Sequence, residues 1–366
     1  MKSNYKQLGQ FIRQVDVRNT EGKEENLLGV SVQKKFIPSI ANTVGTDFKK
    51  YKVVKKGQFT YIPDTSRRGD KIGIALLEDY EEGLVSNVYT VFEIIDEKQL
   101  IPEYLMLWFS RPEFDRYARF KSHGSVREVM DWDEMCKVEL PIPPYEKQKE
   151  IVDGYNAITE RIALKQKIND NLAEYLNCIY IKFTKDMQST TSLSAICDYV
   201  TEKVFFSEVD TSVYISTENI LPDKQGIASF GMTSPSDRVT YFRERDVLVS
   251  NIRPYFKKMW FATTSGGCNA DVLCFRALDK RYSYLLKSIL FQDSFFDYVM
   301  SGAKGTKMPR GDKKHIMQYQ IPCFLDAQLQ KFNEFASSIE QNQALNCQEI
   351  SALESAKETL LTTLSR

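Results

Sequence analysis

Two long stretches of the chain carry apolar residues in alternating steps of three and four, the spacing of a helix that lays a narrow apolar seam on another helix. The seam of the first stretch, which begins near Gln148, contains Ile151, Tyr155, Ile158, Ile162, Leu172, Leu176, Ile179 and Phe183. The seam of the second, toward the C-terminal end, contains Leu329, Phe332, Ala336, Ile339, Ile350, Leu353, Leu360 and Leu364. Each stretch has about 40 residues, which predicts two helices roughly 60 Å long.

Helices of this length exceed the usual globular helix, and their seams predict that the two pair as an antiparallel coiled coil. Polar residues interrupt each seam near its middle: Lys165 and Asn169 in the first, Gln343 and Asn346 in the second. Such polar residues can fix the register of a coiled coil at some cost in stability. The alternative is two separate amphipathic helices, each lying on its own domain.

The residues before each long helix follow a different pattern, in which short apolar runs are broken by glycine and proline and are followed by short helical stretches. These two regions resemble each other at an offset of about 180 residues, which indicates an internal duplication. The matches keep one order along the chain: Tyr104-Leu105 with Tyr284-Leu285, Phe114-Asp115 with Phe296-Asp297, Gly124-Ser125 with Gly305-Thr306, Leu140-Pro141 with Ile321-Pro322, and Gln148 with Gln328. We therefore expect an α+β fold: two similar domains, each a mixed sheet with short helices, joined by the two long helices in a pseudo-twofold arrangement.

The changes of pattern also place the boundaries. We expect a first domain over residues 1–145, a central long helix over 146–188, a second domain over 189–325 and a C-terminal long helix over 326–366. Leu140-Pro141-Ile142-Pro143-Pro144 marks the first boundary, and Glu146 follows in the first helical turn, where the helix dipole favours a negative charge.

Composition places the chain among ordinary globular proteins, since 366 residues with 42% apolar and 27% charged side chains leave ample material for a core. Disordered, collagen-like and small disulfide-stapled classes are excluded. The seven cysteines form no Cys-x-x-Cys pair, which favours reduced thiols in a cytoplasmic protein. No apolar run approaches the roughly 20 residues of a membrane span, and the first residues do not resemble a secretory signal.

Motifs that would indicate an enzyme are missing. Gly302 to Lys307 lacks the spacing of a phosphate-binding loop, and there is no Gly-x-Gly-x-x-Gly turn. His123 and His315, the two histidines, belong to no set of metal ligands, and we interpret both as structural. Ile142-Pro143-Pro144-Tyr145 resembles a loop of amino-methyltransferases, but that loop needs a polar residue where Ile142 stands. We expect no catalytic site, cofactor or metal.

Charge is balanced over the whole chain, with 49 basic and 49 acidic residues, but residues 238–314 contain 15 basic and 7 acidic side chains. Arginines on exposed turns can pair with guanine edges or phosphates, and lysines neutralise phosphates. For any single arginine or lysine, the alternative is that it lies on an ordinary solvent-exposed turn and contacts no nucleic acid. The residues that we assign to DNA contacts are Lys34, Lys35, Arg67, Arg68, Lys71, Arg253, Tyr255, Lys257, Lys258, Lys304, Lys307 and Arg310.

Taken together, several segments resemble the specificity subunit of type I restriction-modification systems. The segments that carry the resemblance are Gly57 to Tyr61, Ser66 to Gly73, Val85 to Phe92, Leu140 to Pro144 with Gln148, Asp246 to Pro254, and Ile321-Pro322. The chain departs from the family pattern at Ile321 to Leu325, where the second boundary lacks a proline pair.

The resemblance implies two target-recognition domains, each reading one half of a split sequence in double-stranded DNA. It implies a non-catalytic subunit that docks two modification subunits, which methylate adenine, and that restriction subunits then join. Two other classes stay open: a DNA-specificity module of another methylation-based phage-defence system, and a coiled-coil scaffold without a role on DNA.

Overall fold

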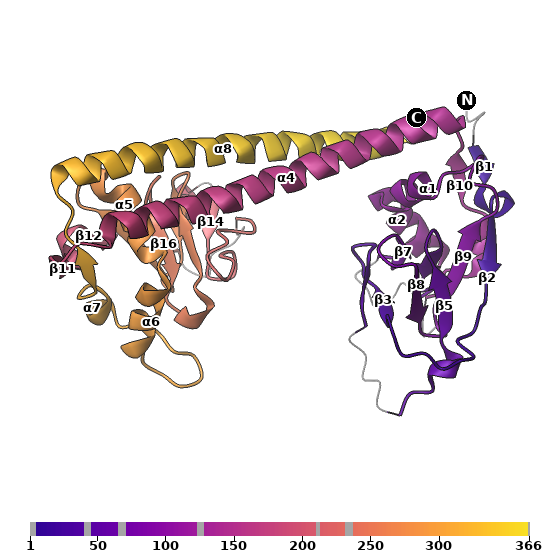
Figure 1. Ribbon diagram of the computed structural model, residues 1–366, viewed down its shortest axis with the longest axis horizontal. Coiled ribbons are helices and arrows are strands. Elements are labelled where there is room, and N and C mark those ends of the chain that lie inside the picture. The colour runs from indigo at the N-terminus through magenta and orange to yellow at the C-terminus, as the bar shows by residue number, and fades with distance from the viewer. Residues whose placement is uncertain are drawn as a thin grey trace. The chain divides into compact units, whose positions relative to one another are not determined.

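The computed structural model describes residues 5–39, 45–64, 71–122, 128–209, 213–230 and 237–364. The chain divides into two compact units: unit 1 contains residues 1–165 and 348–366, and unit 2 contains residues 166–347. The two longest helices, α4 (Tyr145–Thr184) and α8 (Asp326–Thr363), each contribute to both units (Figure 1).

Apart from these helices, unit 1 consists of short strands and short helices. Its strands are β1 (Tyr5–Gln7), β2 (Ile12–Val15), β3 (Leu28–Val30), β4 (Phe36–Pro38), β5 (Lys52–Lys55), β6 (Phe59–Tyr61), β7 (Ile74–Leu76), β8 (Glu82–Val85), β9 (Thr90–Ile94) and β10 (Glu139–Pro141). Its short helices are α1 (Pro102–Phe109), α2 (Pro112–Lys121) and α3 (Trp132–Cys136).

Unit 2 repeats this plan. Its strands are β11 (Thr190–Ser192), β12 (Cys197–Tyr199), β13 (Lys203–Phe205), β14 (Tyr214–Ile215), β15 (Arg238–Phe242), β16 (Val247–Ser250), β17 (Met259–Phe261), β18 (Gly266–Cys268), β19 (Val272–Ala277) and β20 (Gln320–Pro322). Its short helices are α5 (Ser283–Leu290), α6 (Asp293–Ser301) and α7 (Lys313–Ile316).

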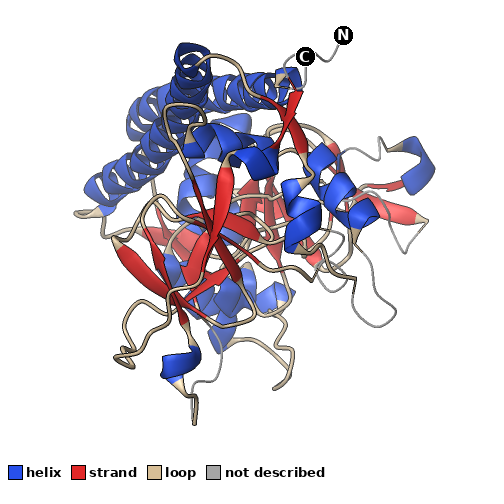
Figure 2. Cartoon of the chain, turned by 90° about the vertical axis from the view of Figure 1, so that its right-hand side faces the viewer, coloured by secondary structure: helices blue, strands red, loops and turns tan. Residues whose placement is uncertain are grey.

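The same four-stranded antiparallel sheet occurs in both units. Its strand order is β2-β9-β6-β7 in unit 1 and β12-β19-β16-β17 in unit 2. The third strand in each order, β6 or β16, has every residue buried, because it lies between two neighbours and its residues are mostly apolar. Unit 2 has a further sheet, β13-β15-β18-β14, in which β14 and β18 run parallel (Figure 2 distinguishes strands from helices). The expected α+β fold with two mixed-sheet domains is confirmed.

The core of each unit includes side chains from both long helices. In unit 1 the rings of Phe59 and Phe92 stack with centroids 4.9 Å apart, and Val152 of α4 and Leu364, just after α8, belong to the same apolar cluster. In unit 2 the corresponding cluster contains Ile179 of α4 and Phe332 of α8. The long helices therefore pack on one another and on the domains, rather than on the domains alone.

Polar residues that interrupt the two apolar seams contact one another. In unit 2 the side chain of Asn346 donates a hydrogen bond to Asn169 Oδ1 at 2.8 Å, and Gln343 Nε2 donates to the Asn169 carbonyl at 2.8 Å. In unit 1 Lys165 Nζ lies 2.9 Å from Glu349 Oε2. The first part of α4 thus contacts the last part of α8, and the last part of α4 contacts the first part of α8, which makes the pair antiparallel.

The start of α4 is tied to unit 1 through Gln148, whose side chain is fully buried. Its Oε1 accepts from the Ile101 amide at 2.9 Å, and its Nε2 donates to the carbonyls of Gln99 and Pro143 at 2.8 Å each. Gln328, the matching residue in the repeat, instead accepts from the Leu325 amide at 3.0 Å, next to the start of α8. One glutamine joins a helix to its domain, and the other caps the helix locally.

Candidate nucleic-acid interface

In each four-stranded sheet, the segment that follows the buried third strand carries the cations singled out in the sequence. In unit 2 this is the β16–β17 turn (residues 251–258), and in unit 1 it is the β6–β7 connection (residues 62–73). Among the described residues, Lys71 thus occupies the same place in the topology as Lys257 and Lys258.

Two residues with left-handed backbones bound the short helical turn η6 (Pro254–Phe256) within the β16–β17 turn. Arg253 has a φ of 49° and Lys257 a φ of 50°, a backbone conformation that residues other than glycine rarely adopt. The Phe256 amide donates to the Arg253 carbonyl at 3.0 Å, and the Lys257 amide donates to the Pro254 carbonyl at 2.8 Å. These bonds and the fixed φ of Pro254 give the turn one defined shape.

Arg253 lies where the β16–β17 turn meets the glycine-containing segment 302–312. Its backbone amide donates to the Pro309 carbonyl at 2.8 Å, and the adjacent Ile252 forms a β-bridge with Arg310. The Arg253 side chain is half-buried, and its Nε is a buried donor without a hydrogen-bond partner in the described part of the chain. Any ligand would therefore meet the accessible part of this half-buried residue, not its Nε.

Residues 302–312 form a loop that presents further cations. The backbones of Lys304 and Arg310 bond to each other, and Gly305 adopts a φ of 95°, which a residue with a side chain would resist. Lys304 Nζ lies 2.5 Å from Asp312 Oδ2, and Arg310 Nη2 lies 3.0 Å from Asp271 Oδ1. Lys307 is exposed and has no ion-pair partner among the described residues.

Asp312 at the end of this loop is also the N-cap of α7. Its Oδ1 accepts from the amides of Lys314 at 2.9 Å and His315 at 3.1 Å. The hydrogen bond from Lys304, and then those from the backbone, lower the pKa of Asp312 to about 2. His315 stacks on Tyr298 with ring centroids 4.1 Å apart, so it packs as a structural residue.

Lys257 and Lys258 point toward the protein rather than away from it. Lys257 Nζ lies 3.0 Å from Asp293 Oδ1 on α6, and Lys224 Nζ lies 2.7 Å from the same oxygen. These two hydrogen bonds, the one from Lys224 first, lower the pKa of Asp293. Lys258 Nζ donates to the Thr217 carbonyl at 2.8 Å. Both lysines therefore shape the turn, and their ammonium groups are already engaged.

Lys34 is the cation whose position differs most from the sequence-based expectation. Its side chain is 7% exposed, its Nζ lies 2.9 Å from Asp115 Oδ1 on α2, and it also donates to the Phe109 carbonyl at the end of α1. Burial lowers the pKa of Lys34, and Asp115 opposes that shift. A phosphate cannot reach this ammonium, so we remove Lys34 from the set of DNA contacts.

The other predicted contacts of unit 1 are exposed or lie outside the described residues. Lys35 and Lys71 are both exposed at the surface. The Ile72 amide, next to Lys71, donates to Asp115 Oδ1 at 3.2 Å, so the carboxylate that holds Lys34 also holds the end of the β6–β7 connection. Arg67, Arg68 and His123 lie outside the described residues.

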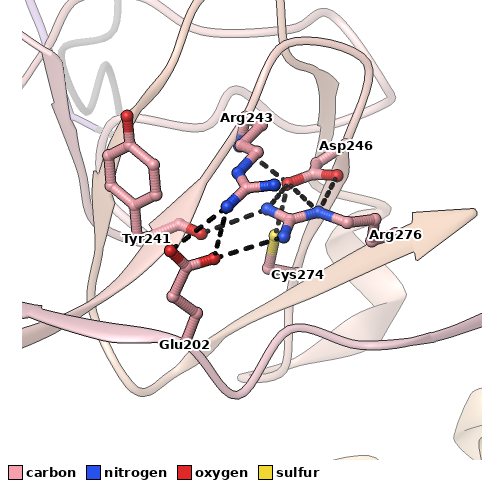
Figure 3. Close-up of polar contacts among 6 residues, drawn as sticks. All are labelled: Glu202, Tyr241, Arg243, Asp246, Cys274 and Arg276. Atoms are coloured by element: carbon pink, nitrogen blue, oxygen red, sulfur yellow. Dashed lines mark hydrogen bonds and ion pairs between the residues drawn. The ribbon is translucent and has the colours of Figure 1, made fainter.

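Sequence reasoning missed an ion-pair network around the buried Asp246 at the start of β16. Asp246 has a side chain 4% exposed and accepts from Arg276 Nη2 at 2.7 Å and from Arg276 Nε at 2.9 Å (Figure 3). The backbone amide of Arg243 donates to Asp246 Oδ2 at 2.7 Å, and Glu202 pairs with both arginines. Hydrogen bonding to Asp246 raises the pKa of Arg276. The network anchors one end of β16, whose other end leads into the β16–β17 turn. Its only signal in the sequence is an acidic residue directly before an apolar run.

Part of the chain matches a known protein family, and the whole chain has the fold of solved structures. Residues 8–174 match the family model of the type I restriction modification DNA specificity domain. The S subunit of a type I restriction-modification system from M. genitalium is similar over 99% of this chain and 96% of its own, with 12% identity and a TM-score of 0.55. A structure described as "Structural basis underlying complex assembly and conformational transition of the type I R-M system" is similar over 99% and 97%, with 15% identity and a TM-score of 0.50. No curated protein sequence matches the chain.

Residues 8–174 thus carry a type I restriction modification DNA specificity domain, which covers most of unit 1 and continues along α4 to residue 174. Over its whole length the chain has the fold of the solved S subunit.

The described residues were also compared with the requirements for a membrane span and for a metal site. No helix in the described ranges is long and apolar enough to cross a membrane. Within the same ranges, histidine, cysteine, aspartate and glutamate side chains form no group of three or more that could hold a metal ion.

Proposed function

We propose that the chain reads a double-stranded DNA target in two parts, with residues 1–145 and 189–325 acting as separate target-recognition domains. The observation that carries this proposal is the repetition of one sheet topology, with a cation-bearing segment after the buried third strand in each copy. Two copies of a DNA-reading unit in one chain favour a target with two half-sites. The long helices, residues 146–188 and 326–366, connect the two domains.

Within each domain we assign different roles to the cations. Arg253, half-buried on the β16–β17 turn, contacts a base edge, and Arg67 or Arg68 does so in the first domain. Lys307, Arg310, Lys35 and Lys71 are exposed and neutralise phosphates. Lys304 supports the loop through its pair with Asp312.

We further propose that the partners are two modification subunits, which methylate adenine, and restriction subunits that join them in the cytoplasm. A groove of about 710 Å³ between α4 and α8 in unit 2 supports a docking role for the helices. Tyr175 and Phe335 line this groove and are 58% and 41% exposed, which leaves apolar surface for a partner.

The decisive experiment is methylome sequencing of cells that produce the modification subunit from the same locus, with and without this chain. We expect adenine methylation at one split sequence only when the chain is present. Arg253→Ala should alter one half of that sequence, and the pair Arg67→Ala and Arg68→Ala the other half. Methylation that does not depend on the chain, or a target without a spacer, would contradict the proposal.

Docking is tested separately by co-purification. The double variant Tyr175→Ser and Phe335→Ser should reduce recovery of the modification subunit with the tagged chain. Leu278→Ser, which changes an apolar residue 64% exposed outside the two long helices, is the matched control and should leave recovery unchanged. Equal recovery with all variants would place the docking surface elsewhere.

A further inference from the structure

The β16–β17 turn carries two adjacent aromatic side chains that unit 2 does not cover. Tyr255 is 47% exposed and Phe256 is 40% exposed. Their ring centroids are 4.6 Å apart and the rings are tilted by 53°, so the two side chains form one small apolar surface. Exposed aromatic rings in contact with each other are a frequent feature of binding surfaces.

The backbone beneath these rings is held from both sides. The Asp223 amide donates to the Phe256 carbonyl at 2.9 Å, and the Lys224 amide donates to the Lys257 carbonyl at 2.9 Å. On the other side, the Arg253 amide donates to the Pro309 carbonyl at 2.8 Å. Since the turn is already ordered, presenting the rings to a ligand requires little loss of conformational entropy.

Basic residues lie close in sequence to the two rings, and one more is bridged to the start of their turn. Arg253 immediately precedes Pro254, and Arg310 is bridged to Ile252. Residues 238–314 contain 15 basic and 7 acidic side chains, a surplus of eight positive charges. This surplus favours DNA over a protein as the partner of the rings, because phosphates attract such a surface wherever it is exposed.

The chemistry of a phenyl ring narrows what it can recognise on DNA. Phe256 has neither a hydrogen-bond donor nor an acceptor, so it cannot read the polar groups of a base edge. Among the base edges in the major groove, the one apolar group is the 5-methyl group of thymine. We propose that Phe256, supported by Tyr255, recognises a thymine 5-methyl group in the half-site read by unit 2. This inference rests on the proposed function, since it assumes that unit 2 contacts DNA.

The test removes that methyl group without changing any hydrogen bond. Once the methylome has defined the target, duplexes are made in which each thymine in turn is replaced by deoxyuridine. Their affinity for the complex of this chain with its modification subunits is measured for the wild type, Phe256→Ala and Phe205→Ala. Phe205 is 51% exposed on β13 and serves as the matched aromatic control.

For the wild-type complex, replacing thymine by deoxyuridine at one position should lower the affinity about threefold to fivefold. That factor corresponds to the free energy of burying one methyl group. Phe256→Ala should bind the thymine and deoxyuridine duplexes equally at that position, whereas Phe205→Ala should keep the wild-type difference. Retention of the difference in Phe256→Ala would overturn the inference, as would a target without a sensitive thymine.

Two more measurements distinguish methyl recognition from insertion between bases and from contact with a protein. A rise in 2-aminopurine fluorescence that depends on Phe256 would show insertion between bases and overturn methyl recognition. Loss of the modification subunit from Phe256→Ala would show that the rings face a protein, and would also overturn it. Failure of the wild-type complex to bind any duplex selectively would instead count against the proposed function itself.

Discussion

Lys34 and Lys224 occupy the same structural position in the two units. Both have a φ of 61°, and each donates to the carbonyl at the C-terminal end of the first short helix, Phe109 for Lys34 and Phe291 for Lys224. Each also pairs with a carboxylate of the second short helix, Asp115 or Asp293. That carboxylate in turn holds the segment after the buried third strand, through the Ile72 amide or through Lys257. The duplication thus preserves the support of the candidate interface as well as the sheet.

Lys34→Ala should destabilise the protein, because it leaves Asp115 largely buried and without its cation. We expect the free energy of unfolding of unit 1 to fall by about 3 kcal/mol, as for other broken buried pairs. Lys35→Ala, a change of the exposed neighbour, is the control and should alter it by less than about 0.5 kcal/mol. Urea unfolding of both variants measures the difference, and equal stability would mean that the Lys34–Asp115 pair does not support the fold.

Arg253 and Lys307 should differ in how they affect DNA binding. Arg253→Ala should cost about 1–3 kcal/mol and relax the preference for one base pair, because a base-reading contact is lost. Lys307→Ala should weaken binding to all sequences alike and reduce the slope of log affinity against log salt by about 1. Titrations of the assembled complex at several salt concentrations, on target and altered duplexes, distinguish the two. A uniform loss with Arg253→Ala would assign that residue to a phosphate instead.

Asp246 should be a major stability determinant of unit 2. Asp246→Ala removes the buried carboxylate that accepts both hydrogen bonds of the Arg276 fork, and we expect a loss of about 2 kcal/mol in the free energy of unfolding. Arg243→Ala is the control: the Arg243 side chain forms an exposed pair with Glu202, which should contribute less than about 1 kcal/mol. Thermal and urea unfolding test this order, and a larger effect of Arg243→Ala would contradict it.

The loop that carries Lys307 should resist mild acid. Asp312 has a pKa of about 2 in the folded protein, below its ordinary value of 3.8, so its contribution to stability is present above pH 3.8 and is lost as the pH falls through about 2. The amide signals of Lys314 and His315, measured by NMR, should therefore change little between about pH 5 and pH 3. Lys304→Met removes the main cause of the shift, and the same signals should then titrate within this range. Titration near the ordinary pKa in the wild type would contradict the assignment.

The long helices α4 and α8 were predictable because their apolar residues recur in regular steps of three and four. Leu176 and Ile179 of α4 and Leu329 and Phe332 of α8 follow these steps, and all four belong to one apolar cluster. The repeat matches likewise predicted two similar domains. The burial of Lys34 was not predictable, since it depends on Asp115 and Phe109, which are distant in sequence, and on a left-handed backbone that a lysine rarely adopts. The ion pair of Lys257 was not predictable for a similar reason, because α6 places Asp293 beside it. The charge of a residue is visible in the sequence, but its partner is set by the tertiary structure.

Leu364 belongs to the core of unit 1, although it is separated from the rest of that core by all of unit 2. During synthesis, therefore, the domain made first cannot complete its core until the last helix has left the ribosome. A chain interrupted anywhere in unit 2 would therefore leave part of the apolar core of unit 1 uncovered.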